Sequence, residues 1–395
     1  MKTIAIRICA CAVMVAALFA GGDSAKPNTN EPSEIAVEKG AKWLASVQGR
    51  DGGWGQDGGE TSYVRQGERL ESNGNDVANT AVAALALRRA GRQYQPQIER
   101  ATDFIMRNVE TSPQEGLSVT RATGTQIQRK LGPFIDTFLT SMLLSEMDGT
   151  MPTTTENLRV RKALEKCVAK IEKNQQGDGS WNIAGGWAPI LGTSMASRSL
   201  FVAQQKGVKV EDKVMAQANN YTLDSLKTPA GGGSATAVTG RAIGGSGGGG
   251  GYDARSTPTA TSAAAGVPLY QSAQALEQLS RTEKDRKANA PQIAAIRAQL
   301  SNTQFVNGFG SIGGEEFFSY LNISDSLRRT GGDEWNRWHA RITKKILRLQ
   351  NQDGTWAGSH CITGRVATTS AAILNLAADR DPLPASTNAT NGIRK

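Results

Sequence analysis

Residues 350–356 read Gln-Asn-Gln-Asp-Gly-Thr-Trp, a Q-x-x-D-G-x-W string that occurs three times in this chain. The other complete copies are residues 48–54 and 175–181, and residues 304–310 form a degenerate fourth copy that ends in glycine instead of tryptophan. Four fixed positions that recur in one chain indicate a repeat architecture, in which each repeat is one supersecondary unit that packs on its neighbours. The motif therefore determines how the rest of the sequence is divided.

Apolar residues at helical spacing precede and follow the motif copies, and the chain divides into six predicted pairs of helices. In each pair the first helix is mixed in polarity and the second is more apolar, which predicts an outer and an inner ring. Closing the ring removes the exposed apolar ends that an open helical array has to cap. We therefore predict an all-α fold over residues 34–380, with six helix pairs in one closed ring. The predicted pairs span residues 34–47 and 77–90, 96–109 and 134–147, 158–173 and 191–205, 210–226 and 262–279, 291–300 and 315–328, and 333–349 and 365–378.

The motif itself is expected to be structural. Its Asp-Gly step forms a sharp turn because glycine takes left-handed backbone angles at no steric cost, and the aspartate accepts hydrogen bonds from N–H groups of the loop. The glutamine is expected to bond carbonyls at the end of its own helix, and the tryptophan to fill the seam between repeats. The residues to which we assign this role are Gln48, Asp51, Trp54, Gln175, Asp178, Trp181, Gln350, Asp353 and Trp356.

Four segments are predicted to lie outside the packed repeats. Residues 1–25 combine two basic residues, a short apolar run and small residues, as secretory signal peptides do, and the run is too short to span a membrane. A polar linker, a glycine-rich loop and a flexible tail are predicted at residues 26–33, 228–258 and 381–395. The sequence thus predicts an exported, soluble protein of the periplasm or the extracellular space, with no transmembrane segment once the signal is removed.

Composition bears on the partners and on the cysteines. The formal net charge is +9, but the basic residues are scattered among acids and no basic run is interleaved with aromatics, so nucleic acid is not an expected partner. Outside the signal peptide the cysteines are Cys167 and Cys361. In an oxidising compartment these two either pair or stay as unpaired, mostly buried thiols, and both alternatives remain open at this point.

The three motif copies resemble those of the prenyltransferase and squalene-cyclase repeat family. Residues 304–310 are similar to the D-G-G-F-G variant in the β subunits of protein prenyltransferases. The resemblance covers roughly residues 34–380 and implies an (α/α)6 toroid. Toroids of this kind include terpene cyclases and protein prenyltransferases, so the fold alone does not settle the activity.

The catalytic residues of that family are incomplete in this sequence. The D-x-D-D motif with which squalene–hopene cyclases protonate their substrate is absent, and aromatics, which stabilise carbocations in cyclase cavities, make up only 6% of the chain. Of the Asp, Cys and His ligands with which protein prenyltransferases hold zinc, only His360 and Cys361 stand out, and a third ligand such as Asp76 or Glu315 would have to come from elsewhere. We therefore predict no cofactor, and zinc is the one that the sequence leaves open.

The starts of the inner helices would meet at one rim of the toroid, where carboxylates from different repeats would face each other as two-carboxylate glycosidases require. These starts supply the candidate catalytic residues Asp76, Asp136, Glu315 and Glu316 and the candidate ligand-binding residues His360, Cys361 and Arg365. The structural alternative is that the acids cap helix N-termini and stabilise the helix dipole. Capping explains Asp136 less well, because this residue is predicted to lie inside its helix.

These observations favour a ligand- or partner-binding protein of the cell envelope, built on this repeat fold without its recognisable catalytic residues. Its ligand would be a lipid, a glycan or a protein. The alternative is an enzyme with a carboxylate site at the rim, acting on a polysaccharide or an isoprenoid-like lipid. The two differ at the rim, since an enzyme requires a pocket in which at least two of the candidate residues converge.

Overall fold

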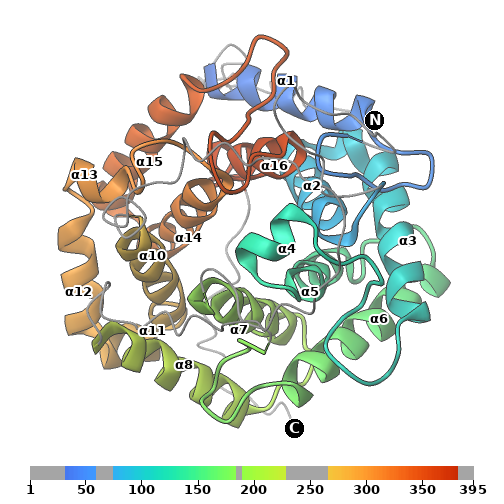
Figure 1. The fold of residues 1–395 in the computed structure, drawn as a ribbon, viewed down its shortest axis with the longest axis horizontal. Coiled ribbons are helices and arrows are strands. Elements are labelled where there is room, and N and C mark those ends of the chain that lie inside the picture. Colours follow the sequence, from blue (N-terminus) through green and yellow to red (C-terminus); the bar gives the residue numbers. More distant parts are fainter. Residues whose placement is uncertain (1–31, 59–73, 184–188, 228–265, 381–395) are drawn as a thin grey trace, which may run out of the picture.

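Two concentric rings of α-helices surround a common axis (Figure 1). The computed structural model describes residues 32–58, 74–183, 189–227 and 266–380. Within these ranges the named elements are all helices, which confirms the predicted all-α toroid. The predicted signal peptide, the linker up to residue 31, the glycine-rich loop and the tail lie outside the described residues.

The inner ring closes on itself. Each inner helix packs against the next one along the chain, and the last packs against the first. Nearly all of their described side chains are buried, as their apolar and small residues predict. The inner helices are α2 (Val77–Ala90), α5 (Ile135–Met147), α7 (Pro189–Gln205), α10 (Val267–Leu279), α14 (Gly314–Thr330) and α16 (Arg365–Leu376).

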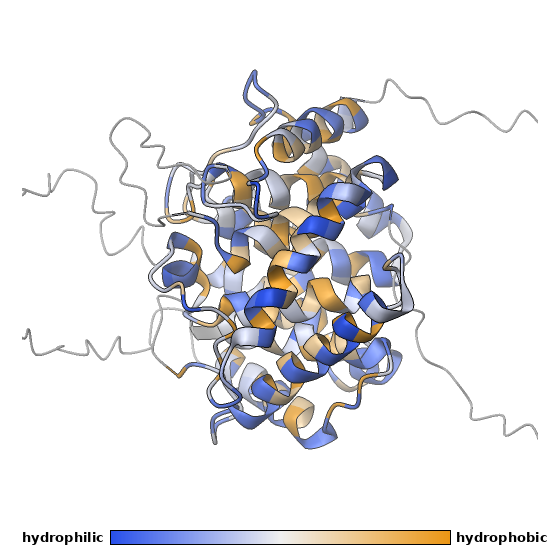
Figure 2. Ribbon diagram, turned by 90° about the vertical axis from the view of Figure 1, so that its right-hand side faces the viewer, coloured by the Kyte–Doolittle hydropathy of each residue, from blue (hydrophilic) through white to orange (hydrophobic). Residues whose placement is uncertain are grey.

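The outer helices carry one apolar and one polar face, and Figure 2 shows polar and apolar residues alternating along their turns. In the last outer helix Trp338, Ile342 and Ile346 are buried at one-turn spacing, while Arg337 and Lys344 are exposed. The outer helices are α1 (Pro32–Ser46), α3 (Gln95–Thr111), α6 (Thr154–Lys173), α8 (Asp212–Lys227), α12 (Ala290–Gln299) and α15 (Gly332–Leu347).

Predicted and observed helix bounds agree to within a few residues. The helix α6 begins four residues before its predicted start because Thr153 and Glu156 form a capping box there. The helix α10 begins at Val267, with Pro268 in its first turn, where proline is tolerated. Sequence patterns did not predict the short helices in the connections, which are η1 (Arg92–Tyr94), α4 (Gln126–Leu131), α11 (Glu283–Ala288) and α13 (Thr303–Val306).

The motif glutamines join consecutive outer helices. Each side-chain amide donates to the carbonyl of its own motif glycine at 2.8–3.1 Å and to a carbonyl near the start of the next outer helix at 2.9 Å. The expected partner, the end of the glutamine's own helix, is not the one observed, because the turn brings the next outer helix within reach. Gln350 bonds Ala36 of α1, so the last repeat is joined to the first.

The motif tryptophans join each outer helix to the inner helix that follows. The indole N–H of Trp54, Trp181 and Trp356 donates to an outer-helix carbonyl ten residues earlier, at 2.6–2.8 Å. The backbone N–H of each tryptophan donates to a threonine hydroxyl of the inner helix. All three rings are at most 3% exposed. These contacts support a structural role for the motif.

The Asp-Gly step of the motif forms the same turn in all three copies. Asp51, Asp178 and Asp353 each accept the N–H group two residues further on, at 2.9–3.1 Å. The glycine that follows has a φ between 86° and 93°. A Cβ at Gly52 would also lie 2.4 Å from the carbonyl oxygen of Arg100, so the backbone angle and the packing both require glycine here.

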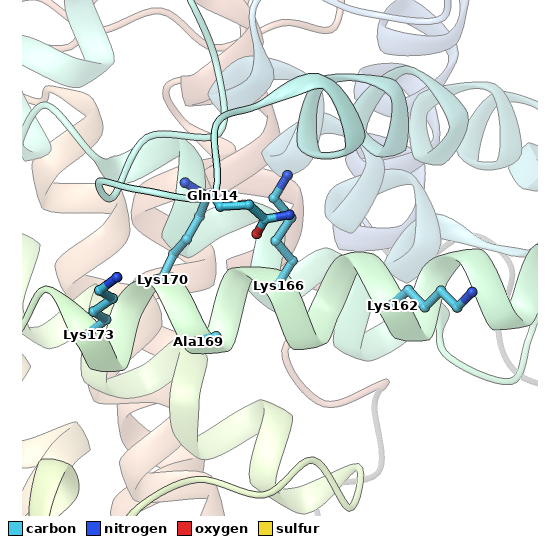
Figure 3. Close-up of a pocket in the computed structure, with 6 residues that line it drawn as sticks. All are labelled: Gln114, Lys162, Lys166, Ala169, Lys170 and Lys173. Atoms are coloured by element: carbon cyan, nitrogen blue, oxygen red, sulfur yellow. The ribbon is translucent and has the colours of Figure 1, made fainter.

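Lysines hold the turns of the degenerate repeats. Lys166 and Lys170 of α6 donate to four backbone carbonyls at the end of α3 and in the turn that follows it, at 2.7–3.2 Å; Figure 3 shows the two lysines beside this turn. After α12, Lys345 of α15 donates to Asn307 Oδ1 at 2.9 Å and to the Tyr320 hydroxyl at 2.8 Å. In both places an ammonium group from the next outer helix holds the turn that a motif glutamine holds elsewhere.

Charged side chains occupy the inside of the inner ring. Arg198 of α7 reaches past α10 to form an ion pair with Asp325 of α14. The buried Glu277 of α10 pairs with Arg281 at 2.7 Å and with Arg329 at 2.9 Å. This charged interior differs from the aromatic lining that carbocation chemistry requires.

Two further properties bear on the predictions. Among the described helices, none combines the length and the apolarity that a membrane crossing needs. Both described cysteines are free thiols, with Cys167 buried and Cys361 half-buried. Of the two alternatives for the cysteines, the structure has the unpaired one.

Candidate functional site

Four of the predicted site residues come together at one rim of the toroid. Glu315 and Glu316 lie in the first turn of α14, and His360 and Cys361 lie in the turn that follows the third motif copy. One donor atom each from Glu315, His360 and Cys361 lies within 4.8 Å of the other two. Both glutamates are fully buried, whereas 20% of the His360 side chain is exposed. The rim therefore gathers a carboxylate, an imidazole and a thiol, and solvent reaches the imidazole.

Glu316 is held by donors from three segments. Its Oε1 accepts the hydroxyl of Tyr270 on α10 at 2.9 Å, and its Oε2 accepts the N–H of Gly313 at 2.9 Å. The Nε2 atom of His360 lies 3.3 Å from the same Oε2. The bond to Gly313 is a capping contact of α14, so the structural alternative describes one of the contacts of Glu316. The other contacts make it the partner of His360.

Glu315 is less satisfied than its neighbour. Its Oε2 accepts the N–H of Ile362 at 3.2 Å, while its Oε1 is buried and has no hydrogen-bond partner among the described residues. Burial raises the pKa of Glu315 to about 7. A buried carboxylate oxygen without a donor is unfavourable, so a proton or a cation at Oε1 would stabilise the site.

His360 and Cys361 face the same point because the backbone turns sharply at Cys361. Its φ of 53° is the one positive value among the described residues other than glycine. Burial by itself lowers the pKa of His360, but hydrogen bonds to Cys361 and Glu316 outweigh it and raise the pKa to about 10. The ring of Phe309 packs edge-on against the imidazole, with 5.3 Å between the ring centres. His360 thus lies beside a carboxylate that stabilises its protonated form.

Arg365, predicted to bind a ligand, does not join this cluster. Its Nε lies 3.6 Å from Asp57 Oδ1, and one terminal nitrogen lies 3.1 Å from Asp353. Its guanidinium also lies over the ring of Trp43, 5.1 Å from the ring centre. These contacts join the first repeat to the last, so Arg365 belongs to the seam of the ring.

Asp76 and Asp136 form a second pair, and both serve the start of α2. Asp76 is its N-cap and accepts the N–H of Asn79 at 2.8 Å, while Asp136 accepts the N–H of Ala78 at 3.1 Å and a bond from Gln128 at 2.7 Å. Asp136 lies inside α5 as predicted, but the expectation that capping explains it less well is corrected, because it caps the start of the neighbouring helix α2. Both acids are at most 2% exposed, so the pair does not present two carboxylates to solvent.

The Asp76–Asp136 pair is expected to make stability depend on pH. Burial raises the pKa of Asp76 to about 6, and burial together with the charge of Asp76 raises the pKa of Asp136 to about 7. The pKa of an aspartate in an unfolded chain is about 3.9. The folded state thus binds more protons between about pH 4 and 7, so the contribution of the pair to stability falls as the pH rises through this window.

Replacing Asp76 by asparagine is expected to raise the free energy of unfolding at pH 8 by about 2 kcal/mol, because one of the two buried charges is removed. At pH 5 the change should be small. Asparagine still caps the helix, and its amide finds an acceptor in the unpartnered Oδ1 of Asn79. Urea unfolding at both pH values measures the difference, and equal effects at pH 5 and pH 8 would contradict it.

Sequence reasoning missed Tyr270 and Phe309, which complete the surroundings of Glu316 and His360. Burial and the charge of Glu316 raise the pKa of Tyr270, so its hydroxyl stays protonated and donates to the carboxylate. No spacing pattern marks Tyr270. Phe309 carried a signal, since it lies in the degenerate motif copy whose phase places it just before α14.

Comparison with known proteins gives matches toward both ends of the chain. Residues 16–128 match the squalene-hopene cyclase C-terminal domain, and residues 317–391 match the prenyltransferase alpha-alpha toroid domain. A squalene–hopene cyclase from Bradyrhizobium diazoefficiens is 36% identical over 81 residues, which cover 20% of this chain and only 12% of that relative. These matches agree with the three motif copies and the closed double ring of helices: the chain is an α/α toroid, and two of its segments are similar to the squalene-hopene cyclase and prenyltransferase domains.

Proposed function

We propose that this toroid is a binding protein of the cell envelope and that its ligand is a transition-metal ion, with zinc as the first candidate, held by Glu315, His360 and Cys361. The observation that carries the proposal is the convergence of these three donor groups within 4.8 Å, beside a Glu315 oxygen that is buried without a partner. A cation there would satisfy that oxygen. The signal-like residues 1–25 support export.

The donor set suits zinc. Proteins bind Zn²⁺ through thiolate sulfur, imidazole nitrogen and carboxylate oxygen, and this cluster offers one of each. Three protein ligands leave the fourth position of a tetrahedral ion for water or a small ligand. His360 and Cys361 are adjacent, and the left-handed backbone of Cys361 lets both face one point. Backbone angles of this kind persist where the surroundings enforce them, and they cluster at ligand sites.

The groups behind His360 are those expected around a metal ligand. A metal-binding histidine usually donates its other ring N–H to a carboxylate or a carbonyl, which fixes the orientation of the ring. The Nε2 atom of His360 lies 3.3 Å from Glu316 and 3.1 Å from the carbonyl oxygen of Ser311, which leaves Nδ1 for an ion. Tyr270 and Gly313 in turn hold Glu316 in place.

Replacing Cys361 by serine is expected to abolish stoichiometric Zn²⁺ binding, because the softest of the three ligands is lost. Replacing Glu316 by glutamine should lower the affinity by about 10–100-fold, because the group that orients His360 is weakened. Calorimetric titration of the full chain with Zn²⁺ measures both effects. The absorption of the Co²⁺-loaded chain reports whether a thiolate is bound.

Cys167→Ser is the matched control, because this thiol is buried on α6 and has no part in the cluster. It should bind metal like the wild type. A wild-type chain that takes up no zinc would contradict the proposal, and so would a Cys361→Ser chain that binds zinc as tightly as the wild type.

The second candidate is an enzyme with a rim site that acts on a polysaccharide or an isoprenoid-like lipid. One observation favours it: Glu315, Glu316 and His360 come from two distant segments and converge at one rim, where His360 is partly exposed. Incubation with representatives of both substrate classes, followed by mass spectrometry of the products, tests it. A product that the wild type forms and Glu315→Gln does not would favour the enzyme over the binding protein.

A further inference from the structure

A cleft between α15 and the turn of residues 307–312 has the volume of a small-molecule site, about 710 Å³. We propose that it binds a phosphate group carried on an apolar chain. Ser311 lines this cleft, and its carbonyl oxygen contacts His360, so the cleft borders the rim cluster without including its metal-type ligands. The proposal is independent of the metal site.

Among the described residues, four cations line the cleft, and no aspartate or glutamate does. Arg341, Lys344, Lys345 and Arg348 all come from α15 and the residue after it. Within the described parts of the chain none of the four is paired with a carboxylate. The ammonium group of Lys345 donates hydrogen bonds to Asn307 and Tyr320. A cleft with one sign of charge concentrates ions of the opposite sign. Several positive charges suit a doubly charged phosphate monoester better than a single carboxylate.

Arg341 adds a donor that lacks an acceptor. Its Nε is buried and has no hydrogen-bond partner in the part of the chain that the structure describes, while the guanidinium lies over the ring of Trp338, 5.0 Å from the ring centre. The indole therefore holds the side chain in place without satisfying this N–H. Guanidinium groups bind phosphate oxygens through strong, directional hydrogen bonds, so a phosphate in the cleft would supply the missing acceptor.

Apolar side chains form the rest of the wall. They include Val306, Ile312, Ile342 and Leu349, and Leu349 is 39% exposed beside the cations. An exposed leucine next to unpaired cations suits a ligand with an apolar part and an anionic head. Burial of that part would add affinity that inorganic phosphate cannot obtain.

The lysines of α6 provide a comparison, because most of them already bind acceptors within the protein. Figure 3 shows Lys162, Lys166, Lys170 and Lys173 along this helix, where they line a smaller pocket of about 320 Å³. Lys166 and Lys170 donate to turn carbonyls, and Lys173 pairs with the carboxylate of Glu115. Lys166, Lys170 and Lys173 therefore have protein partners, unlike the cations of α15, which have no carboxylate partner among the described residues.

Calorimetric titration of the full chain with octyl phosphate tests the proposal. We expect saturable binding at one site, with inorganic phosphate binding more weakly. The double variant Lys344→Gln/Arg348→Gln, which changes two exposed side chains, should bind octyl phosphate about tenfold more weakly or worse, the effect of losing one charge-assisted hydrogen bond. Vesicles of phosphatidylcholine with and without phosphatidylglycerol then identify the source. Binding to the anionic vesicles with the same variant dependence assigns a lipid headgroup, and binding of octyl phosphate alone assigns a soluble ester.

The matched control is Lys162→Gln/Lys213→Gln, which removes the same charge from exposed positions of α6 and α8. It should bind octyl phosphate like the wild type, and so should Cys361→Ser, which separates this site from the metal site. The proposal is overturned if the wild type does not bind octyl phosphate, or if the α15 variant and the control lose the same affinity. Equal affinities for inorganic phosphate and octyl phosphate would overturn the role of the apolar wall.

Discussion

Replacing Trp356 by alanine is expected to lower the free energy of unfolding by about 3–5 kcal/mol. The ring is fully buried, and its N–H donates to the carbonyl oxygen of Ile346 at 2.8 Å. It also packs against α1, where a Cβ added at Gly40 would lie 2.9 Å from the indole. Trp356 thus lies between the last and the first repeat, where the ring closes. Denaturant unfolding followed by circular dichroism measures the loss.

Trp335→Ala is the matched control for this prediction. Trp335 is half-buried on the outer helix α15 and stacks on His339, with 4.7 Å between the ring centres. Its loss should cost only about 1 kcal/mol, as is usual for a partly exposed side chain. If both variants lost the same stability, the closing role of Trp356 would be wrong.

Replacing Glu277 by glutamine is expected to lower the free energy of unfolding by about 3–5 kcal/mol, because buried guanidinium groups are left without a countercharge. Arg281 is 5% exposed, and both it and Arg329 bond the Glu277 carboxylate. Burial alone would raise the pKa of Glu277, but the charges of Arg281, Arg329 and Arg198 outweigh it and lower the pKa. Glu277 is therefore ionised at neutral pH, where unfolding by urea measures the effect.

An exposed pair with the same spacing provides the control. Glu38 and Lys42 on α1 are four residues apart, as Glu277 and Arg281 are, but both of their side chains are more than half exposed. Glu38→Gln should leave stability unchanged within error, because exposed ion pairs contribute little. A Glu277→Gln variant as stable as the wild type would show that the arginines inside the ring do not need this carboxylate.

How much of the fold could be predicted depends on whether a feature is local in the sequence or arises from tertiary packing. A turn motif and an apolar period of 3.6 residues are local properties, and they placed the twelve long helices to within a few residues. Alternation of mixed and apolar helices then separated the outer ring from the inner one, since an apolar helix has to be buried on all sides. The short helices α4, α11 and α13 were not predicted, because a helix of one or two turns is too short to show a repeating apolar pattern.

The candidate site was predictable in its position and not in its contacts. The phase of the motif predicted that Glu315, Glu316, His360 and Cys361 lie at one rim, and the structure brings these four side chains together. The same reasoning placed Arg365 there as a ligand-binding residue, whereas the structure uses it in the seam with Asp57 and Asp353. The repeat motif predicts where a residue lies along its helix axis. Which side chain it contacts depends on how the other repeats pack.

The sequence by itself therefore determined the repeat, the helix pairs, the closed ring and the rim at which reactive side chains gather. Only the tertiary structure decided that Asp136 caps a neighbouring helix, that Tyr270 holds Glu316, and that the cations of α15 line a cleft to which no described carboxylate contributes. The physical reason is range. Turns and helices form from residues a few positions apart, whereas Tyr270 and Glu316 are 46 residues apart and meet only because the closed ring places α10 beside α14.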